Sequence, residues 1–238
     1  MSLILNIETA TGVCSVALAK DGQLLGLKES NTKNSHVSVL TLFIDEIIKT
    51  SGISLSELDA IAVSKGPGSY TGLRIGVAAA KGLCYALEKP LIGVSTLRAM
   101  ALGMPHSSIS SPNRDGENSI LYCPMIDARR MEVYCAIFDD TGKEIRETRA
   151  EIIDEYSFME YLGKNRIVFA GDGALKCRPL FEKHPNAVFS EDFQASARFM
   201  ISLSEEQFLQ KKFENLAYFE PYYLKDFIAG KPKVKGLK

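Results

Sequence analysis

The chain has 238 residues, of which 46 % are hydrophobic and 24 % are charged, a balance typical of a soluble globular protein. This length allows one large domain or two smaller lobes. The formal net charge of −1 excludes a global electrostatic attraction to nucleic acid, so any contact with RNA requires a local patch or a partner.

The cysteines and the N-terminus predict a cytoplasmic protein. The five cysteines are widely spaced and form no C-x-x-C pair, which is typical of buried free thiols in a reducing compartment. The N-terminus lacks the basic and apolar regions of a secretion signal, and no run is apolar enough to span a membrane. We therefore expect neither secretion nor insertion into a membrane.

Three β-like runs open the chain as a meander: Leu3 to Glu8, Cys14 to Lys20 and Gln23 to Glu29. Asp21-Gly22 is typical of a tight hairpin turn between the second and third runs.

The first bend of this meander is a candidate nucleotide site. Glu8 ends a buried strand and is followed by two hydroxyls and a glycine, at Thr9, Thr11 and Gly12, where a nucleotide phosphate would fit. Hydroxyl side chains also satisfy turns through local hydrogen bonds, so both interpretations stay open.

A helix is predicted from about His36 to Lys49, with Ser35 as its N-cap. Burial against one sheet explains most of its wide apolar arc. It does not explain Leu42, which falls on the polar side of the helix between Ser38 and Asp45. This misplaced leucine indicates contact with a protein partner.

The segment Ile61 to Leu87 predicts a strand, a glycine loop from Gly66 to Gly72, and a helix from Leu73 to Leu87. One side of this helix is nearly bare, because Ala78, Gly82 and Ala86 share a row beside Ala79. A glycine inside a helix costs about 1 kcal/mol relative to alanine, so Gly76 and Gly82 predict close approach of another backbone. That backbone belongs either to the chain's own sheet or to a partner helix.

The glycine loop does not match a phosphate-binding motif. Five residues separate Gly66 from Gly72, and Leu73-Arg74 stands where a Walker loop has lysine and a hydroxyl residue. A dinucleotide fingerprint requires a third glycine where this chain has Thr71.

The second half repeats the opening pattern, with β-like runs from Ile120 to Asp127, Glu132 to Phe138 and Glu144 to Ile152. At the end of the first half we expect a strand from Leu91 to Val94 and a short helix through Met100 that Ser95 caps. In the second half we expect a helix from Asp154 to Leu162, a strand from Ile167 to Ala170 that ends in Gly171-Asp172-Gly173, and a helix from Ala195 to Lys212. The second bend joins Asp127 to bulky arginines instead of glycines, which obstructs close backbone approach to a phosphate. Two meanders that each continue into α/β structure predict an internally duplicated fold.

The polar, turn-rich stretch 103–119 is the predicted connection between two lobes. We expect an N-terminal lobe at 1–105 that carries the partner-binding helices, a C-terminal lobe at 106–225, and a basic, disordered tail at 226–238. The three histidines form no close metal-ligand pair, and no G-x-S-x-G motif accompanies a serine, so the sequence predicts no catalytic residues and no metal site.

Five segments together resemble the TsaB family, also called YeaZ, which is related to the transferase TsaD. They read ILNIETAT, AVSKGPGSYTGLRIGVAAAKGL, GVSTLRAMA, MIDARRMEVYCAIF and PYYLKD, and the resemblance extends to Lys225. It implies the two-lobed, actin-like and sugar-kinase-like ATPase fold, whose lobes are ribonuclease H-like.

The resemblance also implies a function without chemistry of its own. The family's members support TsaD, which transfers threonylcarbamoyl to N6 of the adenosine beside the anticodon, and an ATPase, TsaE, joins the pair. The implied partner interface uses the two N-terminal helices, with Val39, Leu42, Phe43, Asp45, Glu46, Gly76, Ala78, Ala79, Gly82 and Ala86. Glu8, Thr9, Thr11, Gly12 and Asp127 mark a vestigial nucleotide site.

Several points stay open at the level of sequence. The free chain could form a homodimer, and ATP or ADP could bind at the interface of the complex. Contact with tRNA is expected only indirectly, through the complex. The alternative functions are a degenerate ATP-dependent kinase and a glycoprotease-like enzyme of the peptidase M22 type. TsaD binds its metal through a His-x-x-x-His motif. In this chain His36 is followed four residues later by Leu40, so that metal site is missing.

Overall fold

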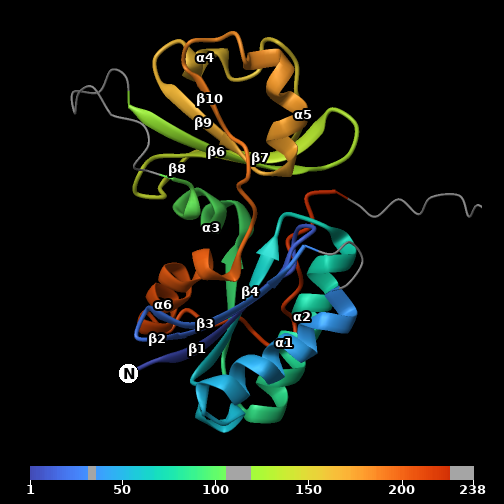
Figure 1. Cartoon of the computed structure of the whole chain (residues 1–238), viewed down its shortest axis with the longest axis vertical. Helices are drawn as coiled ribbons and strands as arrows, with labels where there is room; N and C mark the ends of the chain where they lie inside the picture. The colour runs from blue at the N-terminus through green and yellow to red at the C-terminus, as the bar shows by residue number, and fades with distance from the viewer. Residues whose placement is uncertain (32–35, 106–118, 226–238) are drawn as a thin grey trace, which may run out of the picture.

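The computed structural model describes residues 1–31, 36–105 and 119–225, and shows two lobes stacked along the long axis of the molecule (Figure 1). The predicted N-cap Ser35, most of the predicted connection 103–119 and the predicted tail 226–238 lie outside the described residues.

The first lobe is built on a sheet of five strands in the order β3-β2-β1-β4-β5. The first three strands form an antiparallel meander, and β4 and β5 then run parallel to β1. This agrees with the predicted meander and its hairpin, since Asp21 and Gly22 both have positive φ. The strands are β1 Leu3–Glu8, β2 Cys14–Lys20, β3 Gln23–Ser30, β4 Ala60–Gly66 and β5 Leu91–Ser95.

Helices cover both faces of this first sheet (Figure 1). The helices α1, His36–Ser51, and α2, Tyr70–Leu87, bury apolar side chains against Leu5, Ile7 and Ile61 on one face. A 3-10 turn, η1, Leu55–Glu57, follows α1. On the other face lies α3, Thr96–Gly103, whose N-cap Ser95 accepts from Arg98 N as predicted.

The second lobe repeats this topology with the order β8-β7-β6-β9-β10. As in the first sheet, an antiparallel meander is extended by two parallel strands. The predicted duplication is therefore confirmed. The elements are β6 Ile120–Asp127, β7 Glu132–Phe138, β8 Glu144–Ile152, α4 Met159–Leu162, β9 Arg166–Ala170, α5 Asp172–Phe181 and β10 Ala187–Ser190.

Two segments cross from one lobe to the other. The 3-10 turn η2, Ala197–Met200, and the helix α6, Ile201–Leu209, pack on the first sheet although they follow the second in sequence. Conversely, Leu97 and Met100 of α3, and Met104 directly after it, pack against the second sheet.

Residues 214–225, which we call the C-terminal strap, return to the first lobe as well. Glu214 N donates to Leu91 O at 2.9 Å, and Phe219 is buried in the core beneath α2. Tyr222 N donates to Lys65 O at 2.6 Å, and Lys225 then forms an ion pair with Glu132 of the second lobe.

Four predicted segments differ from the structure. The helix predicted from Leu73 begins at Tyr70, because Ser69 caps it by accepting from Gly72 N at 3.2 Å. The helix predicted from Asp154 begins only at Met159, because the Asp154 side chain closes a turn through Tyr156 N and Ser157 N. The helix predicted over 195–212 divides into η2 and α6. The segment after the strand predicted from Ile167 to Ala170 starts α5, a helix that the sequence did not predict.

Candidate functional site

The outer side of α1 and α2 is the first candidate site. The two helices lie side by side on the first sheet (Figure 1). On α1, the Leu42 side chain is 56 % exposed, whereas Val39 and Phe43 are half-buried. Leu42 thus presents an apolar side chain to solvent, as its position on the polar side of the helix predicted.

Charged residues accompany this leucine on α1. Asp45 forms an ion pair with Lys49 at 2.7 Å, one helical turn away, and Glu46 pairs with Lys28 of β3 at 2.8 Å. All of these side chains are substantially exposed. They give the apolar centre of α1 a polar rim, an arrangement that is typical of protein interfaces.

The small residues of α2 divide between the interior and the surface. Gly76 is buried, and a Cβ added there would lie 2.2 Å from Thr9 Oγ1, so this glycine serves packing within the chain. Ala79 is half-buried against the core. By contrast, Ala78, Gly82 and Ala86 are exposed, and no atom lies within 4 Å of a Cβ added at Gly82.

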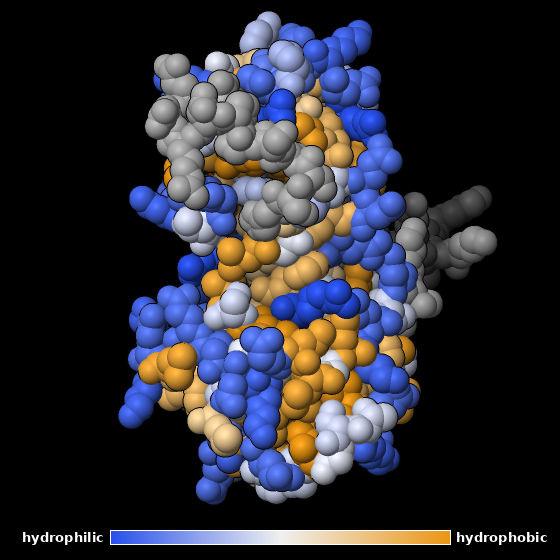
Figure 2. All heavy atoms as spheres, turned by 60° about the vertical axis from the view of Figure 1, so that its left-hand side comes forward, coloured by the Kyte–Doolittle hydropathy of each residue, from blue (hydrophilic) through white to orange (hydrophobic). Residues whose placement is uncertain are grey.

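Figure 2 shows the molecule from the side of α6, where apolar side chains also gather on the lobe of the first sheet. Exposed apolar side chains away from the α1–α2 surface include Leu24, Leu25 and Leu209. Exposed leucines alone therefore do not single out α1 and α2. The row of small residues is the feature that distinguishes α2, because small side chains allow another helix to approach closely.

The bend after β1 is the second candidate site, and its polar groups bond within the chain. Thr9 N donates to Ser64 Oγ at 3.3 Å, and the Thr9 hydroxyl donates to Gly72 O at 2.9 Å. Val13 N donates to Thr11 Oγ1 at 3.3 Å, while Gly12 is exposed. The hydroxyls thus satisfy the turn and the start of α2, as the local interpretation expected.

Glu8 is buried at the start of this bend. One of its carboxylate oxygens accepts from Ala10 N at 2.6 Å. Burial raises the pKa of Glu8 to about 7, and the hydrogen bonds from Ala10, Ser64 and Thr9 oppose that rise only in part. Near neutral pH this acid is therefore divided between its charged and neutral forms.

Asp127 belongs to the other lobe, at the end of β6. It forms an ion pair with Lys176, accepts from Arg129 N at 2.8 Å, and its own N–H donates to Asp172 at 2.9 Å. Arg129 and Arg130, which follow it, both have positive φ. The arginine bend and the lysine together hold this carboxylate at the surface of the second lobe.

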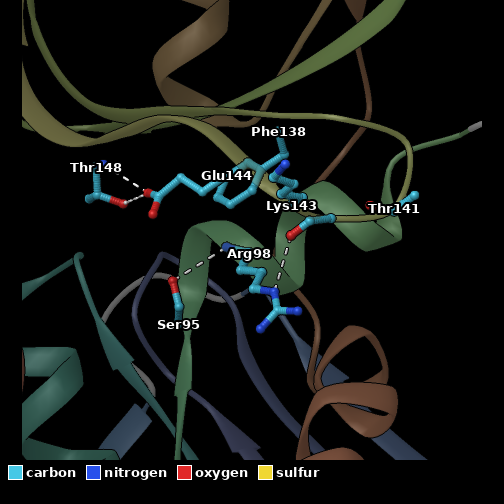
Figure 3. A pocket seen from close by; sticks show the side chains of 8 residues that line it. Ser95, Arg98, Phe138, Thr141, Lys143, Glu144 and Thr148 are labelled. Carbon is cyan, nitrogen blue, oxygen red and sulfur yellow. Dashed lines mark hydrogen bonds between the residues drawn. The ribbon is translucent and has the colours of Figure 1, made fainter.

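A pocket of about 450 Å³ opens between the lobes (Figure 3). Arg98 of α3 reaches across it and donates from Nε to Gly142 O at 3.2 Å. On the opposite wall, Glu144 accepts from Thr148 N at 2.9 Å and from its hydroxyl at 3.0 Å. The Arg98 hydrogen bond joins α3 to the second lobe, whereas the Glu144 bonds lie within β8, and sequence reasoning identified none of these contacts.

Two further properties concern the described residues only. No group of three or more histidine, cysteine or acidic side chains is arranged to hold a metal ion there. Among the helices of these ranges, none is both long and apolar enough to cross a membrane. The five cysteines are free and buried, as predicted.

Comparison with known proteins gives the family. A family model described as TsaD, tRNA N6-adenosine threonylcarbamoyltransferase, matches residues 23–233. The tRNA threonylcarbamoyladenosine biosynthesis protein TsaB of Escherichia coli K12 is 34 % identical over 96 % of both chains. The chain belongs to the TsaB family. The TsaB protein of Haemophilus influenzae is 30 % identical over 96 % of this chain and 95 % of its own.

Solved structures share the fold of this TsaB-family chain. YeaZ from Pseudomonas aeruginosa superposes with a TM-score of 0.73 at 24 % identity, covering 94 % of this chain and all of its own. Another structure from that organism, titled as similar to peptidase YEAZ, gives 0.77 at 25 % identity, with the same coverage. The predicted fold class, two α/β lobes of the actin-like and sugar-kinase-like type that each open with a meander, is confirmed.

Sequence reasoning missed the C-terminal strap as a structural element. Its signal was the PYYLKD segment, which contributed to the family resemblance but was assigned no position in the fold. In the structure, this segment lies against β4 and the start of α2. The strap thus adds exposed tyrosines to the same lobe as the α1–α2 surface.

Proposed function

We propose that this chain is a non-catalytic subunit of the machinery that makes tRNA threonylcarbamoyladenosine. In this proposal it binds and supports the transferase TsaD, together with TsaE, during N6-threonylcarbamoylation of the adenosine beside the anticodon. The names of its TsaB relatives and the description of the matching family model support this function.

The observation that carries the proposal is the exposed row of small residues on α2 next to Leu42 of α1. Helices approach most closely where side chains are small, so Ala78, Gly82 and Ala86 allow a partner helix to lie against α2. Leu42 gains most from such a contact, because a fully buried leucine side chain contributes about 1.5–3 kcal/mol. The charged rim at Asp45 and Glu46 then favours one orientation of the partner.

The two candidate nucleotide positions support a binding subunit more than a kinase. The N–H groups of Thr9 and Ala10 and the Thr9 hydroxyl are the donors that a phosphate would need. They donate instead to Ser64, Glu8 and Gly72 of the same chain. Asp127 is paired with Lys176. ATP or ADP at the interface with the transferase remains compatible with this proposal.

Co-purification with TsaD and TsaE tests the proposed function. Leu42→Glu places a charge in the centre of the surface, and Gly82→Leu fills the space that a partner backbone needs. We expect either substitution to abolish co-purification of the tagged chain with TsaD without lowering its Tm, since both positions are exposed. Co-purification that persists in the double variant would contradict the proposal.

Two control variants make this result specific. Leu175 of α5 is 52 % exposed on the second lobe, so Leu175→Glu makes the same chemical change at matched exposure. Leu209→Glu changes an exposed leucine of the first lobe outside α1 and α2. Both controls should co-purify with TsaD, and loss of binding in the Leu209 variant would assign the interface to α6 instead.

A further inference from the structure

The exposed tyrosines of the molecule gather along one helix. Among the described residues five tyrosines are exposed, and four of these, Tyr85, Tyr218, Tyr222 and Tyr223, lie on α2 or on the C-terminal strap. Tyr218 is the most exposed of these at 83 %. The fifth, Tyr156, lies in the second lobe.

Contacts link α2 to the strap at both ends of this set of residues. The rings of Tyr70 and Tyr223 lie 4.9 Å apart, and the Arg74 guanidinium is 5.4 Å from the centre of the Tyr70 ring. Arg74 also donates to the Tyr70 hydroxyl at 2.9 Å. Farther along α2, Tyr85 lines a pocket of about 510 Å³ together with Leu216 of the strap.

The backbone that carries the tyrosines is held firmly in place. Lys81 Nζ donates to Phe219 O at 3.1 Å and to Ala217 O at 3.3 Å, on either side of Tyr218. Tyr222 N is bonded to Lys65 O, and its own carbonyl lies against Gly66. The rings are therefore presented from a preorganised backbone, which lowers the entropy lost when a ligand binds.

The charge of this region is positive although the whole chain carries −1. On α2, the strap and the residues beside them, five cations, Lys65, Arg74, Lys81, Lys89 and Lys225, stand against four acids, Glu88, Glu132, Glu214 and Glu220. Lys65 and Lys225 form ion pairs with Glu214 and Glu132, which leaves Arg74, Lys81 and Lys89 as the cations beside the rings. In sequence, residues 226–238 add four lysines and one aspartate. Exposed aromatic rings among cations are the combination that binds single-stranded nucleic acid, because bases stack on the rings while cations meet the phosphates.

We propose that Tyr70, Tyr85, Tyr218, Tyr222 and Tyr223, with Arg74 and Lys81, form a surface that binds single-stranded RNA; we call it the tyrosine strip. The inference deepens the proposed function and rests on it, since an RNA loop is the substrate of that machinery. It departs from the expectation that tRNA contacts this chain only through the complex. Tyrosine and arginine are also common at protein interfaces, but Arg74 against the Tyr70 ring and Lys81 beside Tyr218 place cations next to the rings, where a polyanion would meet both.

Fluorescence anisotropy with the full-length chain tests the strip. The probe is a fluorescein-labelled single-stranded oligoadenylate RNA at low salt, compared with the same strand annealed to its complement. Replacing Tyr218 and Tyr222 together by alanine should raise the Kd for the single strand about tenfold or more, because two stacking rings are lost. Binding of the duplex by the unaltered chain should be weaker, since its bases are already stacked.

Three comparisons control this experiment. Tyr156→Ala removes a tyrosine of similar exposure, 75 %, from the second lobe and should leave the Kd unchanged. Phenylalanine at both strip positions keeps the rings and should retain most of the affinity. Arg74→Gln should weaken binding and reduce its dependence on salt concentration.

Failure of this inference is distinguishable from failure of the proposed function. Absence of RNA binding by the unaltered chain at low salt, or a Kd that the double alanine variant does not change, would overturn the RNA surface. Alanine variants that keep RNA affinity but no longer co-purify with TsaD would also overturn it and assign the strip to a protein partner. Co-purification of the unaltered chain with TsaD tests the subunit function separately.

Discussion

The two halves of α2 carry the same small residues in two different environments. In the N-terminal half, a Cβ added at Gly72 would lie 2.1 Å from Thr9 O, and one at Gly76 would lie 2.2 Å from Thr9 Oγ1. In the C-terminal half, Gly82 has no atom within 4 Å of the equivalent position. A glycine in a helix thus predicts close approach without saying whether the approaching group belongs to the chain itself.

The largest expected effect comes from Gly72→Ala in the N-terminal half of α2, which we call the inner half because its glycines face the chain's own core. The added methyl group would overlap a backbone carbonyl, which has less freedom to move than a side chain. We expect a loss of more than about 3 kcal/mol in the free energy of unfolding, measured by urea denaturation. A variant as stable as the unaltered chain would show that the bend after β1 can move away from α2.

Protonation of Glu8, beneath the same inner half, should make stability depend on pH. Its pKa rises from 4.5 in the unfolded chain to about 7 in the fold, so the folded state binds more protons between these values. Stability is then highest below about pH 4.5, as far as Glu8 is concerned, and falls by about 3 kcal/mol as the pH rises through 7. Other groups add their own slopes.

Comparison with Glu8→Gln isolates this contribution. The amide does not titrate, so the variant should lose less stability than the unaltered chain between about pH 5 and about pH 8. Urea denaturation at several pH values measures the difference in slope. Identical slopes for the two proteins would mean that Glu8 titrates at an ordinary pKa in the fold.

The smallest expected effect comes from Gly82→Ala in the C-terminal, outer half of α2. The substitution is the same as at Gly72, but its effect on the free energy of unfolding should have the opposite sign. Alanine has the higher helix propensity and nothing obstructs its methyl group here, so we expect a gain of up to about 1 kcal/mol in the free energy of unfolding. The same urea experiment measures it. A clear loss of stability would contradict the view that this half of the helix is open.

Much of the fold follows from local patterns in the sequence. The meanders, the strand–loop–helix segment around Ile61 to Leu87 and the cap at Ser95 were all predicted, because strand periodicity, turn residues and caps act over a few neighbouring positions. The misses arose where local signals compete. Asp154 favours a turn over a helix through its own side chain, and α5 begins directly after Gly171, which has no side chain to cap a helix.

The candidate surfaces were predictable only in part. Leu42 was identified from its place on the polar side of a helix, and its exposure agrees with that. The inward position of Gly76 was not predicted, because the residue that it packs against, Thr9, lies far away in the sequence. The tyrosine strip was missed for the same reason, because it joins Tyr70 to Tyr223.

The sequence by itself determined the order of elements, the duplication and the family, because each depends on short patterns or on specific segments such as GPGSYTG and IDARR. The tertiary structure decided which glycines of α2 face inward, that α6 and the strap return to the first lobe, and which tyrosines meet on its surface. The physical reason is that packing joins side chains distant in sequence, and periodicity along one element contains no information about what lies against it.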